Sequence, residues 1–218
     1  MPGTVVPLAF SGMLAAALLG AAFDRRSLLV VLGVTAVPDL DAFLALVTTA
    51  GHRALLHNFV IPAVLALGLW VDTTVRPHSL VRGRWGHRGV RIAWVSVLAY
   101  AVSAVGLDLV NGVINPLWPI HDQFYMLDGK LELSDQRGIV QTFVDLSPEE
   151  TVVEAEGVGS SEEVDLSTGV DPDPSGEETD PERIFPVVRA GWELLLLVVG
   201  TVVTTARFYA PVEVPGDD

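Results

Sequence analysis

Five apolar segments recur along this 218-residue chain, and they constrain the fold more than any other feature of the sequence. They cover about residues 7 to 23, 28 to 47, 55 to 71, 92 to 114 and 185 to 206. Each is near the roughly 20 residues that an α-helix needs to cross the hydrocarbon core of a bilayer. Half of the residues are apolar and the mean hydropathy is +0.46, above the usual value for a soluble domain. The sequence therefore predicts an all-α integral membrane protein with about five transmembrane helices.

The arginines predict which way the helices run. Arg25 and Arg26 lie between the first two segments, and five more lie between the third and fourth, at positions 76, 82, 84, 88 and 91. Short loops rich in arginine stay on the cytoplasmic side of a membrane. We therefore expect the N-terminus outside, the C-terminus in the cytoplasm, and residues 115 to 184 outside.

The region between the fourth and fifth segments differs from the rest of the chain in composition. Asp128-Gly129 separates QFYML from KLEL, a pattern that predicts a β-hairpin. Further on, Asp145 to Glu182 holds fourteen acidic residues and no basic one, which predicts a disordered loop. The acidic bias and the single lysine are also typical of a salt-adapted organism. The expected parts are a four-helix membrane domain (1–114), an extracytoplasmic hairpin region (115–145), an acidic flexible loop (146–184) and a fifth helix with its tail (185–218).

Ionisable side chains gather at one predicted depth of the membrane domain, near its outer face. Such residues are costly in a membrane and are therefore usually functional. The set consists of Asp39, Asp41, His52, His57, Asp108, Arg189 and Glu193. Less specific interpretations remain open: the aspartates at 39 and 41 cap a broken helix, Asp108 pairs with Arg189, or Arg189 and Glu193 neutralise each other.

Metal binding is the chemistry that this set of side chains favours. The chain has no cysteine, so any ion would be held by imidazole and carboxylate groups, which suit zinc and also manganese or iron. Asp39 and Asp41 lie about 200° apart around a straight helix and face one ion only if the backbone deviates, for which Pro38 gives a reason. Otherwise one aspartate is a ligand and the other orients an imidazole. We expect His52 on a loop and His57 on the helix that follows it.

These residues resemble the motifs of the membrane-bound metal-dependent hydrolases, a family that includes a LexA-regulated inner-membrane member. Pro38, Asp39 and Asp41 match a PD-x-D motif, while His52, Arg53 and His57 match HR-x-x-x-H, with Asn58 where serine is usual. Asp108 matches the end of an H-x-x-x-D motif, and Asn115-Pro116 matches the turn that follows. Ser11 and Ala104 stand where the family has histidines.

The resemblance implies a hydrolase that acts on a phosphoester or lipid phosphate near the outer membrane face. Its divalent ion, zinc or else manganese or iron, would be held by Asp39, His52, His57 and Asp108. Asp41 would act as the catalytic base or orient a ligand, and Arg189 and Arg53 would bind substrate. The expected partners are membrane lipids, with no nucleic acid. The alternative is a family member that has lost catalysis and binds a lipid or a partner protein.

Overall fold

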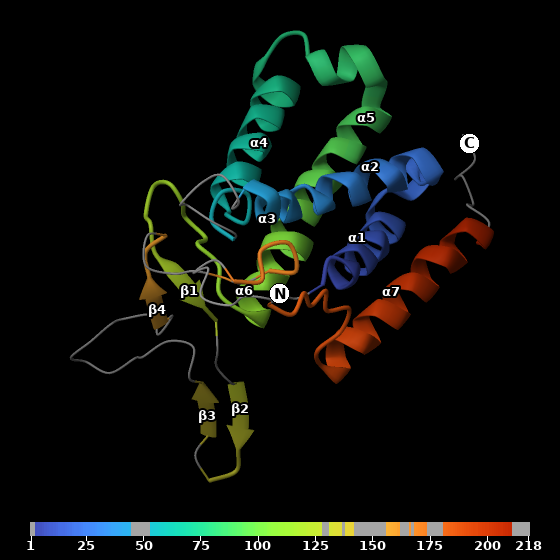
Figure 1. Cartoon of the computed structure of the whole chain (residues 1–218). Helices are drawn as coiled ribbons and strands as arrows, with labels where there is room; N and C mark the ends of the chain where they lie inside the picture. Colours follow the sequence, from blue (N-terminus) through green and yellow to red (C-terminus); the bar gives the residue numbers. More distant parts are fainter. Residues whose placement is uncertain are drawn as a thin grey trace.

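The computed structural model describes residues 3–44, 53–127, 131–136, 138–141, 156–161, 166, 168–173 and 181–210, and these are mostly helical (Figure 1). The helices are α1 (Val5–Leu18), η1 (Gly20–Ala22), α2 (Arg25–Ala36), η2 (Pro38–Leu40), α3 (Asp41–Leu44), α4 (Val60–Trp70), η3 (Val71–Val75), α5 (Leu80–Ala99), η4 (Tyr100–Gly106), α6 (Leu107–Asn111) and α7 (Gly191–Tyr209). The short strands are β1 (Phe124–Met126), β2 (Leu131–Ser134), β3 (Gly138–Gln141) and β4 (Glu156–Gly159).

Two helices in the described part of the chain are long and apolar enough to cross a membrane. They are Leu80–Asn111, formed by α5, η4 and α6 together, and α7. A third span results if α2 and the segment Pro38–Leu44, bent by 41°, count as one. The expectation of five helices of full length is not supported, because Val5–Leu18 and Val60–Val75 are shorter.

The backbone explains why the first segment gives a short helix. Gly20 adopts φ 54°, and a 3-10 turn replaces the α-helix beyond Leu18. The 14 residues of α1 therefore rise only about 21 Å, against roughly 30 Å for the hydrocarbon core.

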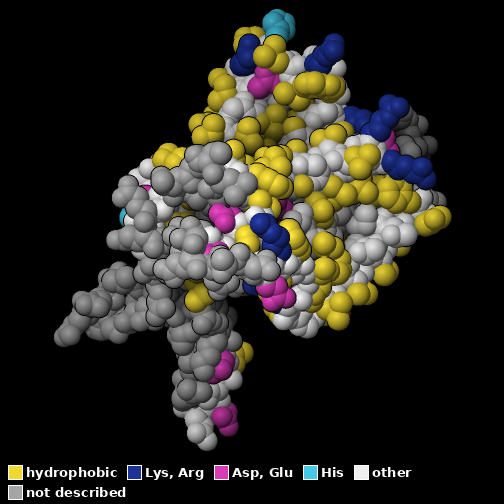
Figure 2. Space-filling view, viewed as in Figure 1, with side chains coloured by type: hydrophobic (Ala, Val, Ile, Leu, Met, Phe, Trp, Pro, Cys, Tyr) yellow, Lys and Arg dark blue, Asp and Glu magenta, His cyan; other side chains and the backbone are white. Residues whose placement is uncertain are grey.

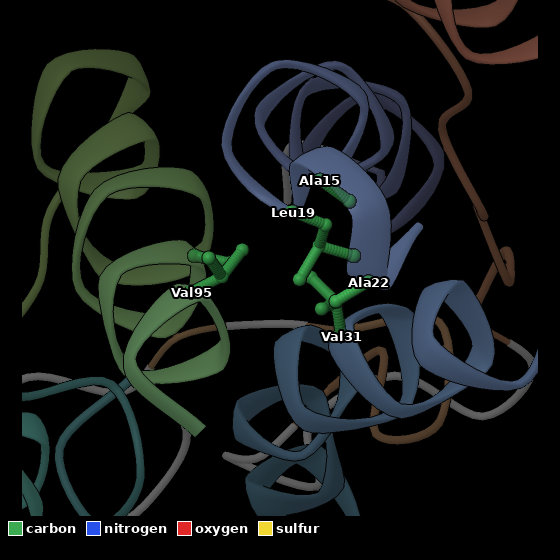
Figure 3. Close-up of a cluster of buried hydrophobic side chains, with 6 residues drawn as sticks. Ala15, Leu19, Ala22, Val31 and Val95 are labelled. Atoms are coloured by element: carbon green, nitrogen blue, oxygen red, sulfur yellow. The ribbon is translucent and has the colours of Figure 1, made fainter. Parts of the chain in front are cut away.

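Helices α1, α2 and α5 enclose a small apolar core. Ala15 and Leu19 meet Ala22, Val31 and Val95 there, and all five are buried (Figure 3). Many leucines and valines of these helices are exposed, which suits helices that face lipid.

Helices α1 and α7, the first and the last, lie side by side (Figure 1). A Cβ atom added at Gly12 would lie 2.6 Å from Oγ1 of Thr204, and one added at Gly200 would lie 2.5 Å from the carbonyl oxygen of Ala9. At Gly200 the backbone of α7 therefore packs directly against that of α1, and at Gly12 the side chain of Thr204 takes up the space.

The arginine-rich stretch, expected to be a loop, is helical. Helix α5 begins at Leu80, where Asp72 accepts hydrogen bonds from the backbone N–H groups of Leu80 and Val81. Gly86 has φ 68° and ψ −168°, so a short helix precedes it and the long helix follows it. Four of the five arginines of this stretch therefore lie on α5, and only Arg76 lies before it.

The β-hairpin predicted around Asp128-Gly129 is wrong in its pairing. Strand β1 pairs with β4, and β2 pairs with β3, the next strand in the sequence. An Asp-Gly dipeptide is a local signal, whereas β4 comes from within the acidic stretch, some thirty residues after β1. The predicted flexible loop 146–184 thus contains a strand, and most of its other residues lie outside the described part of the chain.

Candidate functional site

A break in the helix at Pro38 brings two aspartates to one place, as the sequence predicted. Helix α2 ends at Ala36, Pro38–Leu40 form a 3-10 turn, and α3 starts at Asp41 with a bend of 41°. Asp41 is fully buried, while the side chain of Asp39 keeps 28% of its surface exposed. Both carboxylates face the same imidazole, which a straight helix would prevent.

His57 is at the centre of the site, with a carboxylate at each side of its ring. Its Nδ1 lies 2.7 Å from Oδ2 of Asp41, at hydrogen-bond distance. Its Nε2 lies 3.6 Å from Oδ1 of Asp39 and 3.3 Å from Oδ2 of Asp108. His57 is 1% exposed and lies in the bend that precedes α4, so the expectation that it lies on the helix is wrong. Three segments far apart in the sequence therefore meet at one ring.

Asp108 reaches the site from the end of the long helix. The π-helical stretch η4 comes directly before α6, and a π-helix turns the residues after it around the axis relative to a regular helix. Asp108 lies in the first turn of α6 and is buried. Stretches of this kind are frequent at functional sites.

Arg53 connects the other parts of the site. Its backbone has φ 69°, an uncommon conformation for a residue other than glycine, and its N–H donates to Oδ2 of Asp41 at 2.9 Å. Its Nη1 donates to the carbonyl oxygen of Val113 at 3.0 Å, and its Nη2 lies 3.4 Å from Oδ2 of Asp108. Both Nε and Nη2 are buried, and neither has a hydrogen-bond acceptor at normal distance among the described residues. Arg53 therefore holds Asp108 through the longer Nη2 contact.

Buried polar groups hold the segment that carries His57. Asn58 donates to the carbonyl oxygen of Ala54 and accepts from the N–H of Ile61, while Arg53 and Phe59 pair through their backbones with the predicted turn at Asn115-Pro116. Tyr100 donates its hydroxyl to the carbonyl oxygen of Leu56 at 2.6 Å. The sequence reasoning missed Tyr100, although a tyrosine inside an apolar segment needs a polar partner.

Two distances around His57 match those between ligands that share one divalent ion. Two ligands bound tetrahedrally at 2.0 to 2.2 Å lie about 3.3 to 3.6 Å apart. The distances from Nε2 of His57 to Asp39 and Asp108 fall in this range and exceed the ~2.9 Å of a good N–H···O bond. Asp41 at Nδ1 supplies the carboxylate that commonly orients a ligating histidine.

The charges of the site favour a dication as well. Three aspartates lie around His57, and Arg53 pairs with only one of them, so the site has a net negative charge in a largely buried place. Among the described residues, however, no group of three or more His, Asp or Glu side chains is already arranged to hold a metal ion. His52, the fourth predicted ligand, lies outside the described residues. The residues thus suit a dication by donor type and net charge, although their side chains as placed do not form a complete ligand set.

Two of the predicted residues lie away from this site. Glu193 is buried and accepts a hydrogen bond from the backbone N–H of Arg189 at 2.6 Å, at the start of α7. Arg189 itself is exposed, and none of the ion pairs between described residues joins its guanidinium to Glu193 or Asp108. The expected role of Arg189 in substrate binding thus gains no support from the geometry.

A second polar network fixes the chain beside the site. Asp122 accepts hydrogen bonds from the hydroxyl and N–H of Ser161 at 2.6 and 3.0 Å, and from the amide of Asn115 at 2.6 Å. Burial raises the pKa of Asp122, but the bonds from Ser161 and Asn115 outweigh it and hold the pKa below its usual value. Asn115 also pairs with Arg53, so this network attaches part of the acidic stretch to the site.

No family model matches this sequence, no curated protein matches it, and no solved structure matches the fold. The resemblance to the membrane-bound metal-dependent hydrolases stays a prediction from the motifs.

Proposed function

We propose that this protein is a membrane-bound hydrolase that uses a divalent metal ion, zinc or else manganese or iron, to cleave a phosphoester or lipid phosphate. One observation carries the proposal: Nε2 of the buried His57 faces Asp39 and Asp108 at the spacing of shared ligands, while Nδ1 is bound to Asp41. The motif resemblance supports the same class of enzyme.

The proposed roles follow from the contacts. Asp39, His57 and Asp108 hold the ion, with His52 as the fourth ligand. Zinc in such a site lowers the pKa of a bound water to about 7 and so supplies a nucleophile at neutral pH. The carboxylate of Asp41 accepts the hydrogen bond from Nδ1, so the proton stays on Nδ1 and the lone pair of Nε2 is left for the ion. Asp41 is also the carboxylate nearest the imidazole ring and is the proposed catalytic base. Arg53 positions Asp108 through its Nη2, and its guanidinium is a cation of the type that binds phosphate.

The membrane arrangement belongs to the same proposal. The five apolar segments cross or enter the membrane, and the arginine-rich end faces the cytoplasm. Asp41 and Asp108 then lie toward the outer face, where the substrate would be a lipid phosphate. Single cysteines at Ser79 and Ser160 test the orientation, because the chain has none of its own. A membrane-impermeant maleimide should label position 160 and not 79 on intact cells, and the opposite pattern would invert the topology.

Metal binding is tested with a matched pair of histidine variants. The detergent-purified chain is dialysed against zinc, manganese or iron, and bound metal is counted in the native protein, His57→Gln and His121→Gln. His121 is exposed and bonds to Tyr125. We expect one ion per native chain, the same for His121→Gln, and at least about tenfold weaker binding for His57→Gln. A native protein that retains none of the three metals would refute the proposal.

Hydrolysis is tested separately on phospholipids, phosphatidic acid analogues and pyrophosphates with the metal-loaded protein. Turnover should depend on metal and should be lost in Asp39→Ala. The same turnover in Asp39→Ala would assign it to a contaminant.

A protein that binds a lipid or partner without catalysis is the second candidate. Two observations favour it: the hydroxyl of Ser11 is bonded to Thr35 at 2.8 Å, and Ala104 is buried with no donor atom. Neither position supplies the ligand that the family has there. Metal bound at His57 without turnover of any phosphoester would support this candidate over the hydrolase.

A further inference from the structure

A groove runs between α2 and α5, at the opposite ends of these helices from His57. Its larger hollow has a volume of about 460 Å³ and is lined by Val30, Val81, Trp85, Arg88, Gly89, Ile92 and Ala93. A second hollow of about 260 Å³ shares Val30, Arg88 and Ile92 with it and extends to Asp24, Arg26 and Ser27. The two hollows therefore adjoin. The first is almost wholly apolar, and the second, called the polar hollow below, has mixed walls to which Asp24, Arg26 and Ser27 add polar groups.

The apolar hollow lies on a surface suited to lipid. It is on Leu80–Asn111, one of the two helices able to span a membrane, and Trp85 on its wall is 65% exposed. Tryptophan is enriched where a membrane meets water. Figure 2 shows Lys and Arg side chains gathered at the upper and right-hand edge of the molecule, with hydrophobic side chains on the adjoining surface. An acyl chain fits the apolar walls, and its headgroup would then lie among the arginines.

The polar hollow contains a cation, Arg26, that no carboxylate of the described residues neutralises. Asp24 is already paired with Arg88, whose Nη2 also donates to Ser27 at 2.9 Å. Bonds from Ser27 and Arg88 lower the pKa of Asp24 to about 2, so this pair stays charged. Arg26 lines the same hollow, is exposed, and forms no ion pair with a described residue. The charged side chains that line the hollow, Asp24, Arg26 and Arg88, therefore carry a net positive charge.

We propose that this groove binds an anionic phospholipid, with the headgroup phosphate at Arg26 and one acyl chain along Val30, Trp85 and Ile92. The hollows have the size of small-molecule sites and the walls complement a lipid in charge and polarity. The site is separate from the one at His57, and its occupancy does not require hydrolysis.

The test uses quenching of Trp85 by brominated lipid. The full chain is reconstituted in phosphatidylcholine vesicles that contain a small fraction of brominated phosphatidylglycerol or, in parallel, of brominated phosphatidylcholine. Because the chain has five tryptophans, the signal of Trp85 is the difference between the native protein and Trp85→Phe. We expect brominated phosphatidylglycerol to quench Trp85 at about fivefold lower content than brominated phosphatidylcholine, the effect of one arginine at an anionic surface.

Variants of two arginines test whether the preference for brominated phosphatidylglycerol arises in the groove. Arg26→Gln should remove it, and Arg26→Lys, which keeps the charge and reports on folding, should retain it. Arg84→Gln is the matched control, because Arg84 precedes Trp85 and lines neither hollow; it should leave the preference unchanged. Equal quenching by both lipids in the native protein, or equal loss in Arg84→Gln and Arg26→Gln, would overturn the proposal.

Discussion

The charged residues at the two ends of α2 differ in how deeply they are buried. At the start of the helix, Asp24 and Arg88 form a half-exposed pair, with side chains 44% and 50% exposed. Beyond its end, Asp41, His57 and Asp108 are buried together with Arg53. An exposed pair adds little to stability because water screens it, whereas an unbalanced buried cluster is costly. The chain retains the costly arrangement, which is why we place the chemistry at His57 and only lipid contact at the arginines.

The largest expected contrast comes from removing one arginine at each end. Arg53→Met leaves Asp108 without its cation, and breaking a buried pair in this way costs about 3–5 kcal/mol. Arg88→Met breaks an exposed pair and should cost less than about 1 kcal/mol. Thermal unfolding of both variants in detergent measures the difference. Equal costs would show that burial does not separate the two ends.

The second-largest expected effect is the loss of stability when metal is removed from the His57 end. A ligand present at a hundred times its dissociation constant stabilises the folded state by about 2.7 kcal/mol. Chelation should therefore lower the unfolding temperature, and reloading should restore it, to the same extent in Arg88→Met as in the native protein. No shift on chelation of a protein known to be metal-loaded would contradict the placement of the ion in the folded core.

Alanine substitutions at two glycines test where the helix breaks at the arginine-rich end. Gly86→Ala puts a side chain at φ 68° and should destabilise the protein by about 1–2 kcal/mol. Gly83→Ala, at a helical position with nothing within 4 Å of the added Cβ, should instead stabilise by up to about 1 kcal/mol. Opposite signs in thermal unfolding would locate the helix break at Gly86. A gain for both would indicate a continuous helix.

The smallest expected effect is the loss of the stability that Asp24 contributes as the pH falls. Its folded-state pKa of about 2 is below the ordinary 3.8, so its contribution to stability is complete above about pH 4 and is lost as the pH falls toward 2. In Asp24→Asn the amide can still cap α2 but has no charge for Arg88. The variant should unfold less than about 3 °C below the native protein at neutral pH, and this gap should close near pH 2. A gap that persists in acid would assign the effect to capping alone.

The residue types at the site were predictable because charge in an apolar segment is easily recognised. Asp39, Asp41, His57 and Asp108 were selected in this way, and Pro38 indicated why the first two face one place. Their mutual distances support that selection. Arg189 was selected by the same rule, yet it lies exposed at the start of α7, because common depth in a membrane does not fix the direction of a side chain.

Other features depend on information that a local pattern does not contain. Hydropathy alone does not reveal that Gly20 and Gly86 adopt positive φ values, and these values set the helix ends. Strand β1 pairs with β4 instead of with its neighbour in sequence, since long-range pairing overrides the Asp-Gly turn signal. The partner of the Tyr100 hydroxyl, the carbonyl oxygen of Leu56, lies forty-four residues away in the sequence.

The contact between the first and last helices has a consequence for how the chain is made. Arg207 donates to the carbonyl oxygens of Ala16 and Gly20, which precede it by 191 and 187 residues. At a synthesis rate of about 5–20 residues per second, α1 waits roughly ten to forty seconds before α7 exists. During that interval the face of α1 around Gly12 lacks the contact with Thr204 of α7. The packing of the first helix is therefore completed only after the last helix has been made.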